Sequence, residues 1–235
     1  PDRGVVTGRI KFGTESNGGF KNITITNCTF EFCRGLALET VDGGILEDVT
    51  VDNIVMKDIQ GAPFLLRIGA RMRGPAGVPV GVLRRINISN VVIYSENPKY
   101  CSMIVGIPGH PVEDVRLSNI QIRIKGGAPK ALNQVEEHEK SYPDPQEFGA
   151  MPAYGFFIRH AKNIEFNHVT MKLENDDFRP AFILDDVISA GINDVTMTKV
   201  GTIPSVILKN VEDFKIRNCP QIPDSQIKKI DSTQL

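Results

Sequence analysis

A nine-residue sequence motif recurs along this chain, and it constrains the fold more than any other feature of the sequence. Its four clearest copies are NITITNCTF at 22–30, DVTVDNIVM at 48–56, RINISNVVI at 85–93 and DVRLSNIQI at 114–122. Weaker copies at 163–171, 194–200 and 213–219 keep the same apolar offsets, which makes seven copies in all. Repetition on this scale indicates stacked layers of one supersecondary unit.

Each copy has the pattern of two short strands joined at a corner. Apolar and polar residues alternate, pass an asparagine and reach a further apolar residue, and helical periodicity is absent. Asparagine tolerates the left-handed backbone of a tight corner, and its amide can bond to the same amide one layer away. We therefore expect a column of stacked side chains at the corner positions, which are Asn27, Asn53, Asn90, Asn119, His168, Lys199 and Asn218.

A second repeated element precedes each copy of the nine-residue motif. It is a short apolar strand closed by Gly, Pro or a polar turn, as in GRIKFG at 8–13 and GLALET at 35–40. Each layer then has three strands, and the predicted fold is all-β: a right-handed parallel β-helix, a solenoid of about seven coils. Residues 1–235 are expected to form a single domain, with 220–235 as a cap over the open end. The outward positions of the sheet made by the first strands are Lys11, Ala37, Glu39, Arg67 and Arg159.

The composition excludes several classes of protein. With 41% hydrophobic and 23% charged residues the chain is globular and not disordered. Its net charge of -1 argues against a polyanion-binding surface overall and leaves a local basic cleft as the open alternative. No apolar run approaches the roughly 20 residues of a membrane span. Cys28 and Cys219 take inward positions as small buried hydrophobes, with a Cys28–Cys33 bridge left open, and zinc-ligand spacing is absent.

The chain resembles the polygalacturonase family, the family 28 glycoside hydrolases. The resemblance is carried by FGTESNGGFKNI at 12–23 followed by GLALET at 35–40, and it continues through GIPGHP at 106–111, PAYG at 152–155 and RPA at 179–181. It covers nearly the whole sequence and is closest to the C-terminal portion of a bacterial-type member. The chain opens on proline without a methionine, so we expect a mature or trimmed piece. The resemblance implies that this piece is the C-terminal part of a longer β-helix.

The resemblance implies inverting hydrolysis of α-linked galacturonic acid in pectin or a rhamnogalacturonan-type polysaccharide. That chemistry needs two carboxyl groups roughly 6.5–9.5 Å apart. The family's catalytic aspartates would lie upstream of this chain, which could associate with those missing N-terminal coils. The resemblance further implies a secreted or periplasmic protein with a polysaccharide partner. We expect no cofactor, no metal, no nucleic acid and no membrane.

Two departures from the family pattern affect the expected substrate. Thr7 stands where the family has a histidine, and the sequence Ala37-Leu38-Glu39 replaces the family's Arg-Ile-Lys, which holds the substrate carboxylate. An acid at position 39 argues against a standard galacturonate in that subsite. A rhamnogalacturonan or another galacturonate-bearing chain therefore becomes the favoured variant.

Glu15 and Glu39 are the candidate catalytic residues within this chain. Two carboxylates on adjacent layers could raise each other's pKa enough to make one of them an acid. Either residue could instead hydrogen-bond the substrate, or form an ion pair with a neighbour such as Lys11 or Arg9. Asp185-Asp186 resembles the family's aspartate pair but lies too far along the chain, so we assign it to solvation or to pairing with Arg179.

Other candidates would bind the substrate. Guanidinium groups at 67, 71 and 73 suit sugar carboxylates, although an ordinary solvated loop fits the same residues. His110 follows a Pro-Gly turn and could sit at a cleft rim or be structural, while aromatic residues of the 125–154 region could form a stacking platform or anchor their own loop. The predicted substrate-binding residues are Lys11, Glu15, Glu39, Arg67, Arg71, Arg73, His110, Tyr142, Tyr154 and Arg159.

A second reading from another functional class stays open. The chain could be a non-catalytic β-helix module that binds polysaccharide or another protein, since function depends on the site and not on the fold. A polysaccharide lyase is disfavoured because the sequence shows no calcium-binding acidic cluster.

Overall fold

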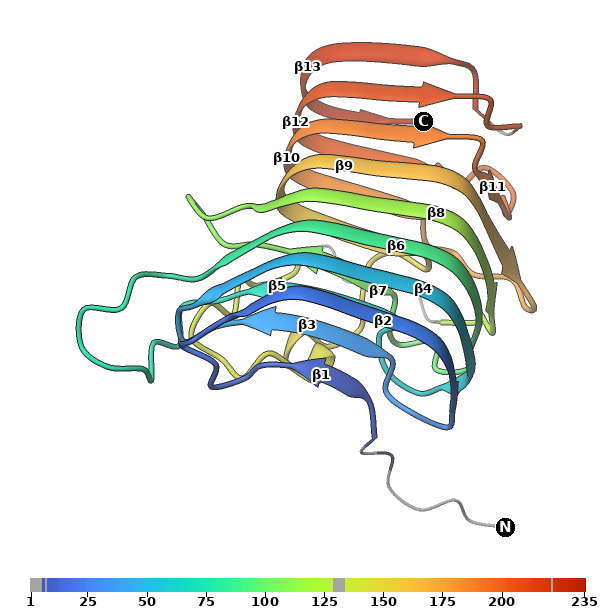
Figure 1. Ribbon diagram of the computed structural model, residues 1–235. Helices are drawn as coiled ribbons and strands as arrows, with labels where there is room; N and C mark the ends of the chain where they lie inside the picture. The colour runs from blue at the N-terminus through green and yellow to red at the C-terminus, as the bar shows by residue number, and fades with distance from the viewer. Residues whose placement is uncertain (1–5, 7, 129–133, 221) are drawn as a thin grey trace.

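The computed structural model describes residues 6, 8–128, 134–220 and 222–235, and it is all-β apart from one short helix (Figure 1). Short and long strands alternate along the first half of the chain. The short ones are β1 (Ile10–Phe12), β3 (Leu36–Thr40), β5 (Phe64–Ile68) and β7 (Ser102–Val105). The long ones are β2 (Phe20–Glu31), β4 (Ile45–Ile59), β6 (Val82–Ser95) and β8 (Val112–Ile124). Then come the 3-10 helix η1 (Pro145–Phe148), β9 (Phe156–Leu173), β10 (Phe182–Asn193), β11 (Thr196–Met197), β12 (Val206–Arg217) and β13 (Ser225–Gln234).

Strand β9 joins the short strands to the long ones. Its first residues pair with β7 and its later residues pair with β8, in parallel register on both sides. The hydrogen-bonded path therefore runs β1-β3-β5-β7-β9-β8-β6-β4-β2 and folds back on itself. Its two ends meet where the ring of Phe12 stacks on that of Phe20, with centroids 4.9 Å apart. These nine strands form a nearly closed, parallel, barrel-like sheet.

The predicted right-handed solenoid of about seven three-stranded coils was therefore wrong. The repeats correctly indicate which strands lie side by side, and the all-β composition and parallel pairing of successive copies are confirmed. They do not reveal that β9 passes without a break from one arm of the sheet to the other, which makes both arms one sheet. The last strand departs further, because β13 pairs antiparallel with β12.

The column of corner side chains is confirmed at six of the seven expected positions. Asn27, Asn53, Asn90, Asn119, His168 and Asn218 have backbone φ between 53° and 57°. Asn53 Nδ2 donates to Asn27 Oδ1 at 2.7 Å, and Asn119 Nδ2 donates to Asn90 Oδ1. Between these pairs Asn90 donates instead to Asp52. The amides thus link layers far apart in sequence.

The corner expected at Lys199 was wrong, since Asp194 occupies it with φ 51°. Asn193 pairs with Asn167, which places Asp194 beside His168, the corner of the preceding layer. Each layer has a second left-handed corner five residues earlier, at Asp48 in β4 for example. Most corners of either kind are Asn or Asp residues followed by alternating apolar residues, with Arg85, Ser189 and His168 as the exceptions. The sixth copy was therefore aligned on the wrong corner.

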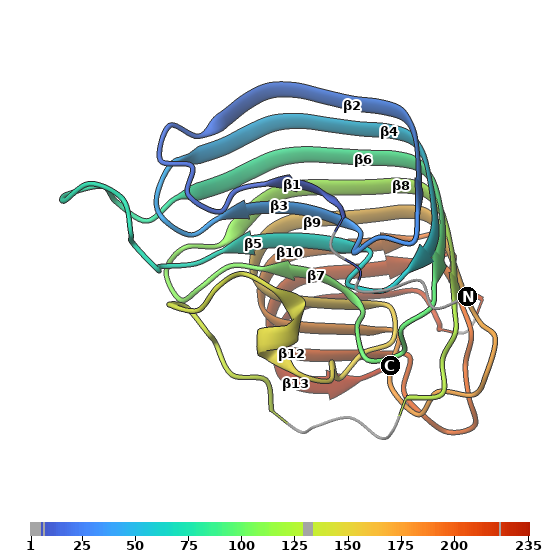
Figure 2. The ribbon, with the colours of Figure 1, turned by 90° about the horizontal axis from the view of Figure 1, so that it is seen from below.

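Two hydrophobic clusters stabilise the sheet. The larger one fills its interior with the inward residues of both arms, such as Leu38, Val51 and Ile88. The smaller one lies on the outer face of the short strands and of β9 and β10, where Leu65, Met103 and Phe157 cluster with Phe148 and Met151 of the 134–153 segment. We call this segment the covering loop. Figure 2 shows it in yellow, with η1 near β7.

Replacing a corner asparagine should destabilise the protein through its backbone as well as its amide. We expect Asn90→Ala to lower the free energy of unfolding by about 2 kcal/mol, because alanine is strained at φ 54° and loses two interlayer hydrogen bonds. Asn90→Gly removes only the hydrogen bonds and should cost about 1 kcal/mol. Chemical denaturation would measure both, with Asn87→Ala on the same strand as the control. Equal effects at 87 and 90 would contradict the corner column.

Candidate functional site

The covering loop closes the outer face where the substrate residues were expected. Arg67 is 1% exposed, and its guanidinium donates to the carbonyl oxygens of Gly106 (3.1 Å), Glu137 (2.7 Å) and His138 (3.1 Å). Burial lowers the pKa of Arg67 to about 10. The ring of Phe148 packs against the same guanidinium, with 5.0 Å between the ring centroid and Arg67 Cζ. Arg67 therefore anchors the loop, and its donors are already used.

Glu39 is enclosed under the same loop and is 0% exposed. Its Oε2 lies 2.9 Å from Lys11 Nζ, which also donates to the hydroxyl of Tyr142 at 2.9 Å. Neither oxygen of the Glu39 carboxylate has a well-oriented hydrogen bond among the described residues. The contact with Lys11 is therefore an ion pair whose distance is short but whose angle does not suit a hydrogen bond. Burial raises the pKa of Glu39, against the effect of Lys11.

Glu15 and Glu39 do not act on one another as the sequence suggested. The side chain of Glu15 is 67% exposed and faces Arg71 Nη2 at 3.4 Å and Arg73 Nη1 at 3.9 Å. Arg71 donates hydrogen bonds from two of its nitrogens, Nε and Nη2, to the carboxylate of Asp42. These hydrogen bonds hold the pKa of Asp42 below its usual value. The alternative of pairing with neighbouring cations is what the structure shows for both acids.

Tyr142 links these groups at the surface. It is 47% exposed, and its ring lies 4.4 Å from Lys11 Nζ and 5.9 Å from the guanidinium of Arg71. The hydrogen bond from Lys11 lowers the pKa of the Tyr142 hydroxyl. The structure thus brings six predicted residues together at the β1–β3 end of the sheet: Lys11, Glu15, Glu39, Arg71, Arg73 and Tyr142.

Tyr154 and His110 lie apart from this group. Tyr154 is 3% exposed, and its hydroxyl donates to the carbonyl of Thr198 at 2.8 Å, so it offers no ring face to a ligand. His110 is exposed at the tip of a turn, where its backbone pairs with that of Ile107. Thr7, the departure at the family's histidine position, lies outside the described residues.

An open groove of about 620 Å³ begins where the covering loop ends. Its floor is an apolar row of Phe157, Ile183 and Ile207, which sit side by side on β9, β10 and β12. Its rim carries Phe178, which is 58% exposed, and three prolines at 152, 180 and 204. We call this cavity the loop-side groove. Its volume lies within the range of small-molecule sites in proteins.

A charged row runs beside the apolar floor. Arg159, Asp185 and Lys209 pair in register on the same three strands. Arg159 is 5% exposed, with its Nη1 at 2.5 Å from Glu137 Oε1 and its Nε at 3.7 Å from Asp185 Oδ2. Lys209 is exposed and has no ion-pair partner in the described part of the chain. One guanidinium therefore lies between two carboxylates, with a free cation alongside.

Glu137 is also held by a histidine. His160 Nε2 lies 3.2 Å from the Glu137 carboxylate, and its Nδ1 lies 2.6 Å from Asp186 Oδ2. Burial acts to raise the pKa of Glu137, but the hydrogen bonds from Arg159 and His160 hold it below its usual value. Glu137 is therefore an ionised carboxylate at neutral pH.

Of the two alternatives for Asp185-Asp186, pairing with Arg179 was wrong, and both side chains are partly exposed to solvent. Arg179 is buried and pairs with Asp177, whose Oδ2 lies 2.7 Å from Nη2. Asp185 instead turns toward Arg159, and Asp186 accepts from Asn210 as well as facing His160.

Sequence reasoning missed the residues that define the loop-side groove apart from Arg159. Glu137 and Phe178 lie in irregular segments without a repeat, so periodicity gives them no position. Lys209 could have been found, because it occupies the same outward position as Arg159 and Asp185 in the short apolar element of its layer. Asp42 and Asp144, the partners of Arg71 and of Arg9 and Arg34, carried no sequence signal.

Within the described ranges, no group of three or more His, Cys, Asp or Glu side chains has an arrangement that could hold a metal ion. The four cysteines are unbonded, and Cys28 is only partly buried. A helix long and apolar enough to cross a membrane is absent from the part that the structure covers.

Comparison with known proteins gives a distant likeness to a solved structure and no match in sequence. No family model and no curated protein matches this sequence. Among solved structures, the chain is similar to the crystal structure of a "putative glycosyl hydrolase" from Parabacteroides merdae. The two are 11% identical with a TM-score of 0.33, and the likeness covers 94% of this chain and 84% of the other. At that score the likeness carries no argument about the site.

The enclosure of Glu39 should make stability depend on pH. Because the pKa of Glu39 is raised by folding, the folded state holds its proton more tightly than the unfolded chain. The stabilisation that protonated Glu39 gives the folded state is complete below the pKa of the unfolded chain, about 4.3, and is lost as pH rises through the pKa of the folded state. The amide of the Glu39→Gln variant cannot ionise, so only the wild type loses stability as pH rises. The free energy of unfolding of the variant minus that of the wild type should therefore increase from pH 4 to pH 8.

The control for this measurement is Glu15→Gln, which removes a carboxylate that is largely exposed. Its difference from wild type should stay nearly flat in denaturant titrations over the same pH range. A flat or falling difference for Glu39→Gln would show that position 39 is not enclosed as described.

Proposed function

We propose that this protein binds a polysaccharide in the loop-side groove, as the saccharide-binding portion of a protein of glycoside hydrolase type. The observation that carries the proposal is the exposed Phe178 at the rim of a groove with an apolar floor and a charged row beside it. Sugars stack their CH faces on apolar and aromatic surface, while side chains at the edge bond their hydroxyl and carboxylate groups.

The proposed ligand carries galacturonate units, as in pectin or rhamnogalacturonan. The residues first expected to hold the sugar carboxylate are engaged elsewhere, with Arg67 bonded to loop carbonyls and Arg71 to Asp42. Lys209 supports this ligand class, because it is exposed beside the apolar floor and lacks an acidic partner among the described residues. A polysaccharide ligand fits the proposal of a secreted or periplasmic protein.

Hydrolysis is a second candidate function, and one observation favours it. Glu137 and Asp185 reach the loop-side groove on either side of Arg159, and an inverting hydrolase uses two carboxyl groups flanking the scissile bond. The low pKa of Glu137 suits a general base and not a general acid. The acid would then be Asp185, which faces the same guanidinium from the other side. Measuring new reducing ends together with binding separates hydrolysis from binding alone.

Substitutions at the groove rim should weaken binding without affecting the fold. We expect Phe178→Ala and Lys209→Ala each to weaken the affinity for hexagalacturonate about fivefold, through lost stacking and a lost charge contact. Isothermal titration calorimetry would measure the affinity. The controls are Ile188→Ala, an exposed apolar residue of β10 outside the groove, and Lys228→Ala on β13.

The affinities of the Ile188→Ala and Lys228→Ala controls show whether a loss of binding is specific to the loop-side groove. Unchanged affinity in the two rim variants, or equal losses in the two controls, would overturn the assignment of the ligand to the loop-side groove.

A further inference from the structure

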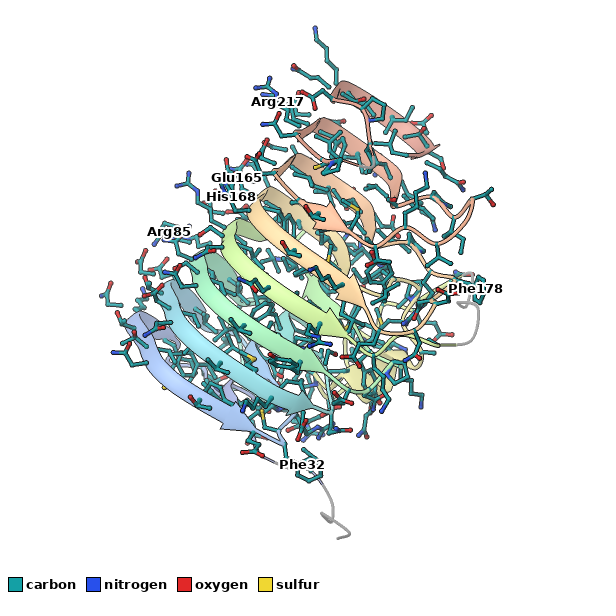
Figure 3. The ribbon with its side chains drawn as sticks, turned by 90° about the vertical axis from the view of Figure 1, so that its right-hand side faces the viewer. Phe32, Arg85, Glu165, His168, Phe178 and Arg217 are labelled. Atoms are coloured by element: carbon teal, nitrogen blue, oxygen red, sulfur yellow. The ribbon has the colours of Figure 1, made fainter. Side chains whose placement is uncertain are left out.

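A second and larger groove lies on the other side of the molecule, along the bend in the long strands. It has a volume of about 1050 Å³ and is lined mainly by outward residues of β4, β6, β8, β9, β10 and β12. We call it the bend groove. Figure 3 shows Arg85, Glu165 and Arg217 along one side of the stack and Phe178 on the opposite side. The bend groove is therefore separate from the loop-side groove.

Its floor is a row of polar side chains set by the strand register. In order across the strands the row is Thr50, Asn87, Arg116, Glu165, Gly191 and Lys215. Neighbouring strands are about 4.8 Å apart, so hydrogen-bonding groups repeat at that spacing. A straight row of this kind suits an extended polymer that lies across the strands.

Gly191 leaves a gap in this row. A Cβ atom built there would approach Asn193 Nδ2 at 3.3 Å and Glu165 Cγ at 4.0 Å, and both are side-chain atoms. Packing therefore does not demand a glycine at this position in a regular strand. The missing side chain deepens the groove between Glu165 and Lys215.

The charges of the bend groove are balanced at one end and unbalanced at the other. Arg85 pairs with Asp48 at 2.7 Å, and Arg116 pairs with Glu165 at 3.3 Å. Lys215 and Arg217 line the other end, and no side chain of the described residues forms an ion pair with either. Asp213 is the nearest carboxylate in sequence, so this end keeps an excess of positive charge.

The lining disfavours a protein as the occupant. It contains no aromatic side chain, and its apolar members Val49, Ile164 and Ala190 are core residues that are at most 5% exposed. Protein interfaces take most of their binding energy from aromatic and other large anchors in apolar pockets. The hydroxyl, amide, carboxylate and cationic groups of the row both donate and accept hydrogen bonds, which is instead suited to a hydroxyl-rich chain.

From these features we propose that the bend groove is a second binding site, for an acidic polysaccharide whose carboxylates meet Lys215 and Arg217. The site does not depend on the loop-side groove. It would let one molecule hold two polysaccharide segments on opposite sides.

The test uses hexagalacturonate and its fully methyl-esterified form, which has the same backbone without charge. We expect hexagalacturonate to shift the amide resonance of Gly191 in nuclear magnetic resonance spectra of the whole chain. The double variant Lys215→Ala/Arg217→Ala should weaken this response about tenfold, since each exposed charge contact contributes up to about fivefold. The response should also weaken as salt is raised.

Lys209→Ala is the matched control, because it removes an exposed lysine from the other groove and should leave the Gly191 response unchanged. This control also separates the two proposals: loss of binding at the loop-side groove alone leaves the Gly191 signal intact. The inference is overturned if hexagalacturonate does not shift Gly191, if the methyl ester shifts it equally, or if the double variant binds as wild type does.

Discussion

The structure depends on exact vertical stacking of equivalent residues, and left-handed corners make that stacking possible. Asn27, Asn53, Asn90 and Asn119 turn the chain at the same height in each layer, with φ near 55°. Interlayer bonds such as Asn53 to Asn27 then hold neighbouring corners together. Because the strands between corners are parallel and in register, every outward position becomes a row across the sheet. Both grooves are consequences of this arrangement.

The covering loop decides which part of the outer face a ligand can reach. Arg67 and Arg159 rise from the sheet and bind backbone oxygens of residues 135–138, so cations that could have met a substrate hold protein instead. Apolar contacts of Phe148 and Met151 add to this anchoring. The face is therefore enclosed over β3, β5 and β7, and beyond the buried Phe157 of β9 it opens into the loop-side groove over β10 and β12. A ligand on this side has the loop-side groove available to it.

The sequence predicted the layers better than it predicted the site. Alternation of apolar residues identified the parallel strands, and the asparagines identified the corners, because both follow from local backbone preference. Lys199 was misplaced because the two corners of one layer look alike. The closure of the sheet through β9 was missed because periodicity shows which strands stack, not where one strand ends. Glu137 and Phe178 were missed because irregular segments have no register to place them.

We propose that a polysaccharide chain occupies the open end of the outer face, beside the covering loop. A crystal structure of the protein with a bound oligogalacturonate tests this most directly. We predict electron density for sugar rings over Ile183 and Ile207, with Phe178 against a ring and Lys209 near a carboxylate. Density over Tyr142, Arg71 and Arg73 instead, with the covering loop displaced from Arg67, would contradict the account.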